Sequence, residues 1–227
     1  MAEIYHILSR GVDKRKIFLE EEDYLRFVHD LFEFNDREAA LNIGYFFKNQ
    51  YIDLRSRYIG EKRQKRKFLV KILIFCLMPN HYHLLLTPIV EGGITKFMRK
   101  LNIGYAKYFN QKYERVGALF QGRYKSIHIQ NDSHFIHLPY YIHLNPLDLK
   151  FPEWRGGEIK NYKGAIKFLE NYRWSSFLDY IGKKNFPSIT QRDLLLEFFE
   201  GPENYKKETI KWLKEMDLKN IKEATLE

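Results

Sequence analysis

Apolar side chains alternate with polar ones, or form short unbroken runs, in a pattern typical of β-strands in four parts of the chain. These parts are residues 4–9, 68–77, 81–88 and 119–129. The second and third are separated only by Met78-Pro79-Asn80, a turn containing Pro and Asn. We therefore expect these two strands to be neighbours in the fold.

Other segments place apolar residues at helical spacing, as Leu25, Val28, Leu31 and Phe32 do in the first of them. The predicted helices are Glu21–Phe34, Ile94–Tyr113, Asp132–Asn145 and a final one between Asn204 and Glu223. The order strand, helix, strand, strand, helix, strand is that of the ferredoxin-like, split βαβ fold. The sequence thus predicts an α+β protein in which helices pack on an antiparallel sheet, followed by a C-terminal helical tail.

The composition points to a polyanionic partner. The 227 residues include 38 Lys and Arg and 29 Asp and Glu, which gives a formal net charge of +9. The 16 Tyr and 18 Phe could add stacking surfaces for single-stranded bases, although most must be core. The basic run at residues 62–67 is either a solvated hairpin tip or a phosphate-binding surface.

The single Cys76 cannot form an internal disulfide, which fits a reducing compartment. No apolar run approaches the roughly 20 residues that span a bilayer, and the N-terminal residues lack a signal-peptide pattern. We expect a cytoplasmic protein without a membrane partner.

Two histidines, His81 and His83, interrupt an otherwise apolar strand. Side chains two positions apart in a strand leave the same face, so both imidazoles can reach one cation while Tyr82 points the other way. On the pair alone, a polar stripe on an edge strand is the competing interpretation.

Tyr141 and Asn145 lie four residues apart on the third predicted helix and share a face. Pro146 disfavours helical geometry at Asn145, so the helix should end there and leave the amide oxygen available to a metal. His81, His83 and Asn145 would form a nitrogen and oxygen site suited to Mg²⁺ or Mn²⁺ with positions open to phosphate. Tyr141 is then either a nucleophile toward phosphorus or a packed aromatic side chain.

Several segments together resemble a known family, the REP-associated tyrosine transposases, which are single-tyrosine HUH transposases of the insertion-sequence-200 type. The segments are Tyr5–Gly11, Leu77–Leu86, Tyr105–Asn110, Gly117–Ser126, Tyr141–Pro146, Trp174–Phe177 and Tyr180–Gly182. Each is moderately specific, and their shared order is highly specific. The resemblance implies a catalytic domain over residues 1–182, with a basic insertion at about 36–67, and a helical extension over 183–227.

The resemblance implies cleavage and rejoining of single-stranded or hairpin DNA through a 5′-phosphotyrosine intermediate. It makes His81 and His83 the metal ligands, Asn145 the third ligand and Tyr141, rather than Tyr140, the nucleophile. It also leaves open a homodimer that exchanges its tyrosine helices.

Three features depart from the family pattern. Tyr82 stands where an aliphatic residue is usual, and the segment at residues 36–67 is longer and more basic than usual. Pro139 should kink or restart the helix that carries Tyr141. Candidate phosphate contacts lie at predicted turns and strand ends, with solvated surface charge as the alternative. They are Arg10, Lys14, Arg15, Arg123 and Lys125.

Two other activities remain open. One is a non-catalytic protein that binds structured DNA or RNA on the same fold. The other is a replication or conjugation relaxase, although nothing in the sequence suggests a helicase or a second tyrosine in that arrangement. His6 we expect either to support the site or to pack, with packing favoured, and Asn110 to cap a helix rather than bind a metal.

Overall fold

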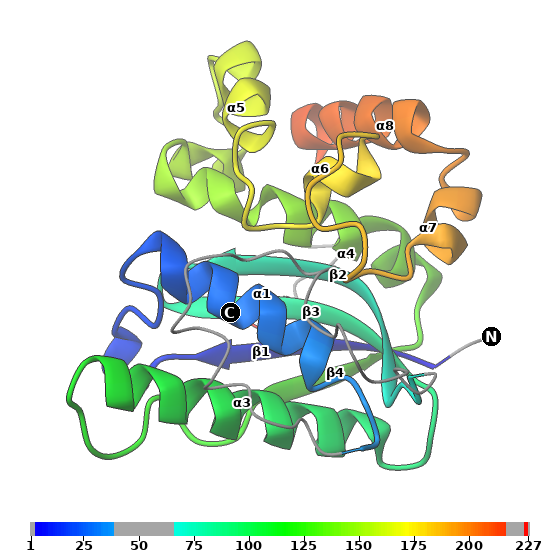
Figure 1. The fold of residues 1–227 in the computed structure, drawn as a ribbon. Helices are drawn as coiled ribbons and strands as arrows, with labels where there is room; N and C mark the ends of the chain where they lie inside the picture. The colour runs from blue at the N-terminus through cyan, green and yellow to red at the C-terminus, as the bar shows by residue number, and fades with distance from the viewer. Residues whose placement is uncertain (1–2, 39–65, 217–224, 227) are drawn as a thin grey trace.

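The computed structural model describes residues 3–38, 66–216 and 225–226. Its centre is a four-stranded antiparallel sheet in the order β2-β3-β1-β4 (Figure 1). With helices between β1 and β2 and between β3 and β4, this is the ferredoxin-like arrangement, and the fold predicted from the sequence is confirmed. The predicted basic insertion lies mostly outside the described residues.

The strands and helices have these bounds. The strands are β1 (Ile4–Arg10), β2 (Val70–Met78), β3 (His81–Pro88) and β4 (Lys125–Ile129). The α-helices are α1 (Glu21–Glu33), α3 (Gly93–Lys112), α4 (Asp132–Leu144), α5 (Tyr162–Leu169), α6 (Phe177–Tyr180), α7 (Asp193–Phe198) and α8 (Pro202–Glu215). The 3₁₀ helices are η1 (Val12–Lys14), η2 (Asn145–Leu149) and η3 (Pro152–Gly156).

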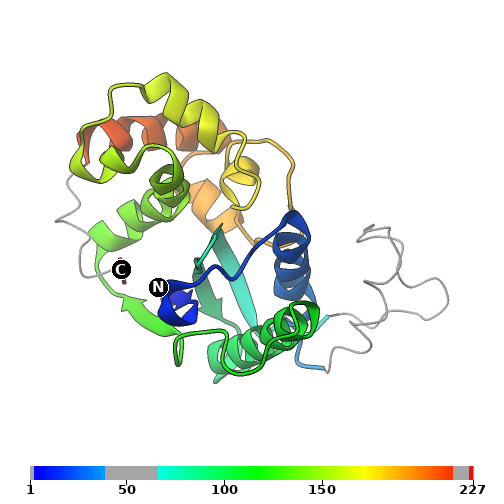
Figure 2. The ribbon, with the colours of Figure 1, turned by 90° about the vertical axis from the view of Figure 1, so that its left-hand side faces the viewer.

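Helices cover both faces of the sheet. Figure 2 shows the sheet between α1 and α3 on one side and the helices α4 to α8 on the other. Alternation along each strand divides the apolar side chains into two separate cores. In β3, Leu84 and Leu86 enter the core under α1 and α3, whereas Leu85 enters the core under α4.

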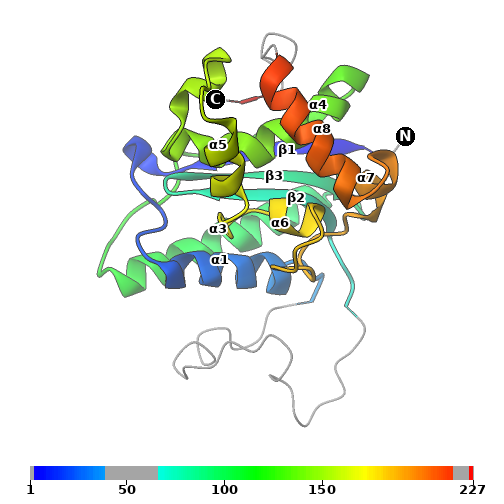
Figure 3. The same cartoon turned by 90° about the horizontal axis from the view of Figure 1, so that it is seen from above.

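The C-terminal helices are part of the second core. Viewed from above, α8 lies over α4 (Figure 3). The two helices are joined by a buried hydrogen bond of 2.7 Å between His143 Nδ1 and the hydroxyl of Tyr205. Because Tyr205 and Leu213 share a core with Tyr141, the segment after residue 182 packs directly on the helix that carries the predicted nucleophile.

Some predicted boundaries differ from the structure. The last strand begins at Lys125 rather than Leu119, because Gly122 takes a left-handed φ of 65° in a turn that ends the extended run. The last helix runs from Pro202 to Glu215 and ends there, because Met216 takes extended dihedral angles. Asn145 keeps right-handed helical dihedral angles despite Pro146, because the chain continues directly into η2. The expected loss of helical geometry at Asn145 is therefore wrong.

Pro139 does not restart α4. The helix runs as one element from Asp132 to Leu144 with Pro139 inside it. Within the part of the chain that the structure describes, no helix combines the length and the apolar character needed to cross a bilayer.

Candidate active site

The two histidines of β3 lie on the sheet face that α4 covers. His81 and His83 are both buried, and their ring centroids are 5.0 Å apart with the rings nearly perpendicular. Tyr82 points to the opposite face, where it packs against Phe27 and hydrogen-bonds to Asn102. Strand alternation thus brings the imidazoles together, as the sequence predicted.

A neighbouring amide orients the ring of His81. Its Nδ1 lies 2.7 Å from Oδ1 of Asn80, the last residue of the turn before β3. An amide oxygen only accepts hydrogen bonds, so Nδ1 must carry the proton and the lone pair of the neutral ring resides on Nε2. Fixing one ring nitrogen in this way is a common feature of metal-binding histidines.

His83 is held by a third histidine. His6 Nε2 on β1 lies 2.9 Å from His83 Nδ1, and the two rings stack with centroids 5.1 Å apart. Both side chains are completely buried. Of the two roles expected for His6, support of the site and packing, this polar bond to a predicted ligand favours support of the site.

Tyr141 lies against the histidine pair. Its ring meets that of His83 edge to face, with centroids 6.3 Å apart and an angle of 89° between the planes. Both residues belong to one chain, so the contact needs no tyrosine helix from a second copy. Tyr141 has no solvent-exposed surface in this conformation.

Sequence reasoning missed Arg155, a residue of η3 that contacts the side chains of three neighbours. Its Nη1 donates to the phenolic oxygen of Tyr141 at 3.0 Å, and its Nη2 donates to Asn145 Oδ1 at 3.1 Å. Two further bonds, of 2.8 and 2.6 Å, join the guanidinium to the carboxylate of Asp148. The only available signal was a lone arginine ten residues after Asn145, in a segment without periodicity.

Both ends of the Asn145 amide are engaged. Its Nδ2 donates to the backbone oxygen of Tyr141 at 2.9 Å, and its Oδ1 accepts the bond from Arg155. The prediction that this oxygen stands free is wrong. An amide oxygen has a second lone pair, so the role of Asn145 as third metal ligand stays a prediction.

The donor set fits a hard or borderline divalent ion that keeps water or phosphate ligands. Two imidazoles and an amide oxygen provide nitrogen and oxygen without sulfur. Among the described residues, no three side chains of His, Cys, Asp or Glu gather in a way that could hold a metal ion. A metal here would therefore depend on the histidine pair together with neutral oxygen donors.

The predicted phosphate-contacting residues gather at the same end of the sheet as His81. Arg10 on β1 pairs directly with His81 on β3. Leu8 pairs with His83 on one side and with Lys125 of β4 on the other. Because paired residues point to the same face of a sheet, both cations share the face of the two histidines. Lys14 and Arg123 are exposed in adjoining turns. Arg15 lies partly exposed, with its Nε donating to the backbone oxygen of Val12 at 3.2 Å.

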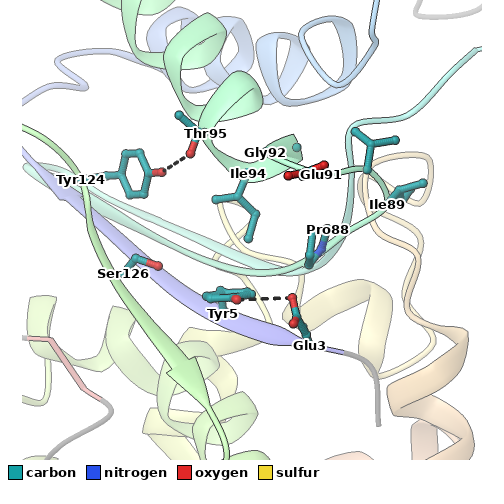
Figure 4. A pocket seen from close by; sticks show the side chains of 12 residues that line it. Glu3, Tyr5, Pro88, Ile89, Glu91, Gly92, Ile94, Thr95, Tyr124 and Ser126 are labelled. Carbon is teal, nitrogen blue, oxygen red and sulfur yellow. Dashed lines mark hydrogen bonds between the residues drawn. The ribbon is translucent and has the colours of Figure 1, made fainter.

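A cavity of about 460 Å³ opens at the opposite end of β3. Tyr5 and Tyr124 line it together with the N-terminus of α3, as Figure 4 shows. None of the predicted site residues lines this cavity. The histidines and the tyrosine thus define a site separate from it.

Fold and site together define a class of protein: a split βαβ domain with an H-x-H pair on its sheet and a tyrosine on the covering helix. Residues 45–145 match the model of a family described as transposase IS200 like. This match includes both the histidine pair and Tyr141, and it supports the resemblance to transposases of the insertion-sequence-200 type.

Two further comparisons were made. None of the curated proteins matches the chain. A solved structure described as a REP-associated tyrosine transposase bound to a REP hairpin is 14% identical, with 85% of this chain and 87% of that chain covered and a TM-score of 0.48.

Proposed function

We propose that this protein is a metal-dependent endonuclease and strand transferase for single-stranded or hairpin DNA, acting through a 5′-phosphotyrosine intermediate. The observation that carries the proposal is the edge-to-face contact between Tyr141 and His83, with His81 5.0 Å from His83 on the same face. The proposed nucleophile thus contacts the proposed pair of metal ligands, although it comes from a distant part of the sequence.

Tyr141 would perform the chemical step. Its phenolic oxygen attacks the scissile phosphorus, so that the Oη–P bond forms while the bond from phosphorus to the 3′ oxygen breaks. The phenolic proton passes to solvent, and the departing 3′ oxygen takes up a proton. Rejoining is the reverse, with a 3′-hydroxyl attacking the phosphotyrosine and the phenol restored.

His81 and His83 would hold the divalent ion, with Asn145 as the third protein ligand. Bound there, Mg²⁺ or Mn²⁺ would polarise the scissile phosphate and neutralise developing charge. Asn80 and His6 orient the two imidazoles through their Nδ1 atoms. Arg10 and Lys125, on the same sheet face, would contact the DNA backbone.

The test uses an oligonucleotide with a hairpin and a single-stranded flank, incubated with the full chain and Mn²⁺. The native protein should form a covalent adduct that resists denaturing electrophoresis. Both Tyr141→Phe and addition of a chelator should abolish the adduct, while Tyr140→Phe should leave it. Adduct formation by Tyr141→Phe would show that the nucleophile is another residue.

A second candidate is a non-catalytic binder of structured nucleic acid. The complete burial of Tyr141 favours it, since neighbouring side chains must move before a phosphate can reach the phenolic oxygen. This alternative predicts hairpin binding that a chelator does not change, with no cleaved strand under any metal.

A further inference from the structure

We propose that Arg155 is a further catalytic residue, whose guanidinium stabilises the negative charge on the Tyr141 oxygen while its bond to phosphorus forms and breaks. The inference rests on the proposed function. Its basis is the 3.0 Å bond from Arg155 Nη1 to the phenolic oxygen, the atom that would react.

The guanidinium is held in place by several side chains. Asp148 accepts two bonds from Arg155 and a third, of 2.6 Å, from the indole nitrogen of Trp154. The arginine also lies near the rings of Trp154 and Tyr141, at 5.0 and 5.4 Å from their centroids. A cation fixed before the reaction needs no reorganisation when charge appears beside it.

Three other tyrosines, of which Tyr105 and Tyr180 are fully buried, show what a structural role looks like in this chain. The hydroxyls of Tyr105, Tyr172 and Tyr180 donate to backbone oxygens at 2.6 to 2.8 Å. The oxygen of Tyr141 accepts a bond from a cation. An accepting oxygen beside a permanent positive charge is suited to a phenol that must become a phenolate.

The same contact would act in both directions. In cleavage the phenolic oxygen bears partial negative charge before its bond to phosphorus is complete. In rejoining, the bond between the phenolic oxygen and phosphorus breaks. The oxygen of Tyr141 leaves with negative charge and then takes up a proton. Arg155 therefore should lower both barriers by a similar amount and change the equilibrium between adduct and cut strand little.

The experiment compares single-turnover rates of adduct formation and of rejoining for the native protein, Arg155→Lys and Arg155→Ala. Loss of one charge-stabilising donor commonly costs about 10²- to 10³-fold in rate. We expect Arg155→Ala to slow both directions by about that factor while the Kd for the hairpin changes less than about threefold. Arg155→Lys should be intermediate, and added guanidinium should restore part of the rate of Arg155→Ala.

The matched control is Arg173→Gln, which also removes one positive charge but lies on the surface with Glu21 as its partner. It should keep the native rates. Melting curves identify any variant that fails to fold. If Arg155→Ala fails to fold, Arg155→Lys still tests the inference, because it retains the charge opposite Asp148.

Two results would overturn the inference. If Arg155→Ala forms the adduct as fast as the native protein, the arginine has only a structural role. If Arg155→Ala forms the adduct faster, the bond from Arg155 inhibits the reaction of the Tyr141 hydroxyl. Both outcomes still require an adduct that depends on Tyr141, so they differ from failure of the proposed function, in which Tyr141→Phe and the native protein behave alike.

Discussion

His6 and His83 are joined across two neighbouring strands by a hydrogen bond of 2.9 Å between Nε2 and Nδ1. In this ladder His83 lies opposite Leu8, so His6 reaches it diagonally. The bond fixes the orientation of one predicted metal ligand from outside the ligand set.

Replacing His6 should therefore weaken metal binding. Loss of such an outer contact typically costs about 10- to 100-fold in metal affinity, and we expect His6→Ala to raise the Kd for Mn²⁺ by that factor in a calorimetric titration. His128→Ala is the control, because His128 is an exposed histidine of β4 stacked on Tyr5. Equal affinities for His6→Ala and the native protein would show that His6 only packs.

The buried His143 should make the protein less stable in acid. The ring of His143 is buried against the hydroxyls of Tyr205 and Ser176. This burial lowers the pKa of His143 from 6.5 to about 3. Between these pH values the unfolded chain binds a proton that the folded chain does not, so the free energy of unfolding falls as the pH decreases from 6.5 toward 3.

One such group contributes at most about 1.4 kcal/mol per pH unit. Urea unfolding at several pH values should show a flatter acid limb for His143→Gln, which lacks the titrating ring, than for the native protein. Identical slopes in the two proteins would assign the acid sensitivity to other groups.

The exposed cations near His81 should make hairpin binding sensitive to salt. Each phosphate contact contributes about 0.7 to 0.9 to the slope of log K against log salt concentration. Lys14→Gln and Arg123→Gln should each reduce the slope by about that amount. Lys71→Gln serves as the control, because Lys71 is exposed on β2 at the far edge of the sheet. An unchanged slope in Lys14→Gln would remove that lysine from the DNA surface.

The helix α8 should be needed for a stable site. Tyr205 is completely buried in the core that also contains Tyr141, and truncating a buried aromatic to Ala costs about 3–5 kcal/mol. We expect a loss of that size for Tyr205→Ala in denaturant unfolding. Phe198→Ala, at a side chain 49% exposed, should cost far less. A loss for Tyr205→Ala as small as that expected for Phe198→Ala would mean that α8 contributes little to the core.

Much of the site follows from local periodicity. Alternation in β3 places His81 and His83 on one face and Tyr82 on the other, and the order of elements identifies the fold. Helical spacing likewise predicts that Tyr141 and Asn145 share a face, and Arg155 contacts the side chains of both.

The contacts that sequence reasoning missed depend on tertiary structure. His6 and His83 are 77 positions apart, and their meeting is set by the register between β1 and β3, which a single sequence does not reveal. Arg155 reaches Tyr141 only because η2 and η3 turn the chain back after α4. No repeating pattern marks such a contact.

The most direct test of the central claim is to identify the residue that carries the DNA. After reaction with a hairpin oligonucleotide and Mn²⁺, the full chain is digested with nuclease and protease, and the peptides are sequenced by mass spectrometry. We predict a nucleotide 5′-phosphate linked to Tyr141. A phosphate on Tyr140 or another residue, or no linked peptide although the strand is cut, would contradict the mechanism.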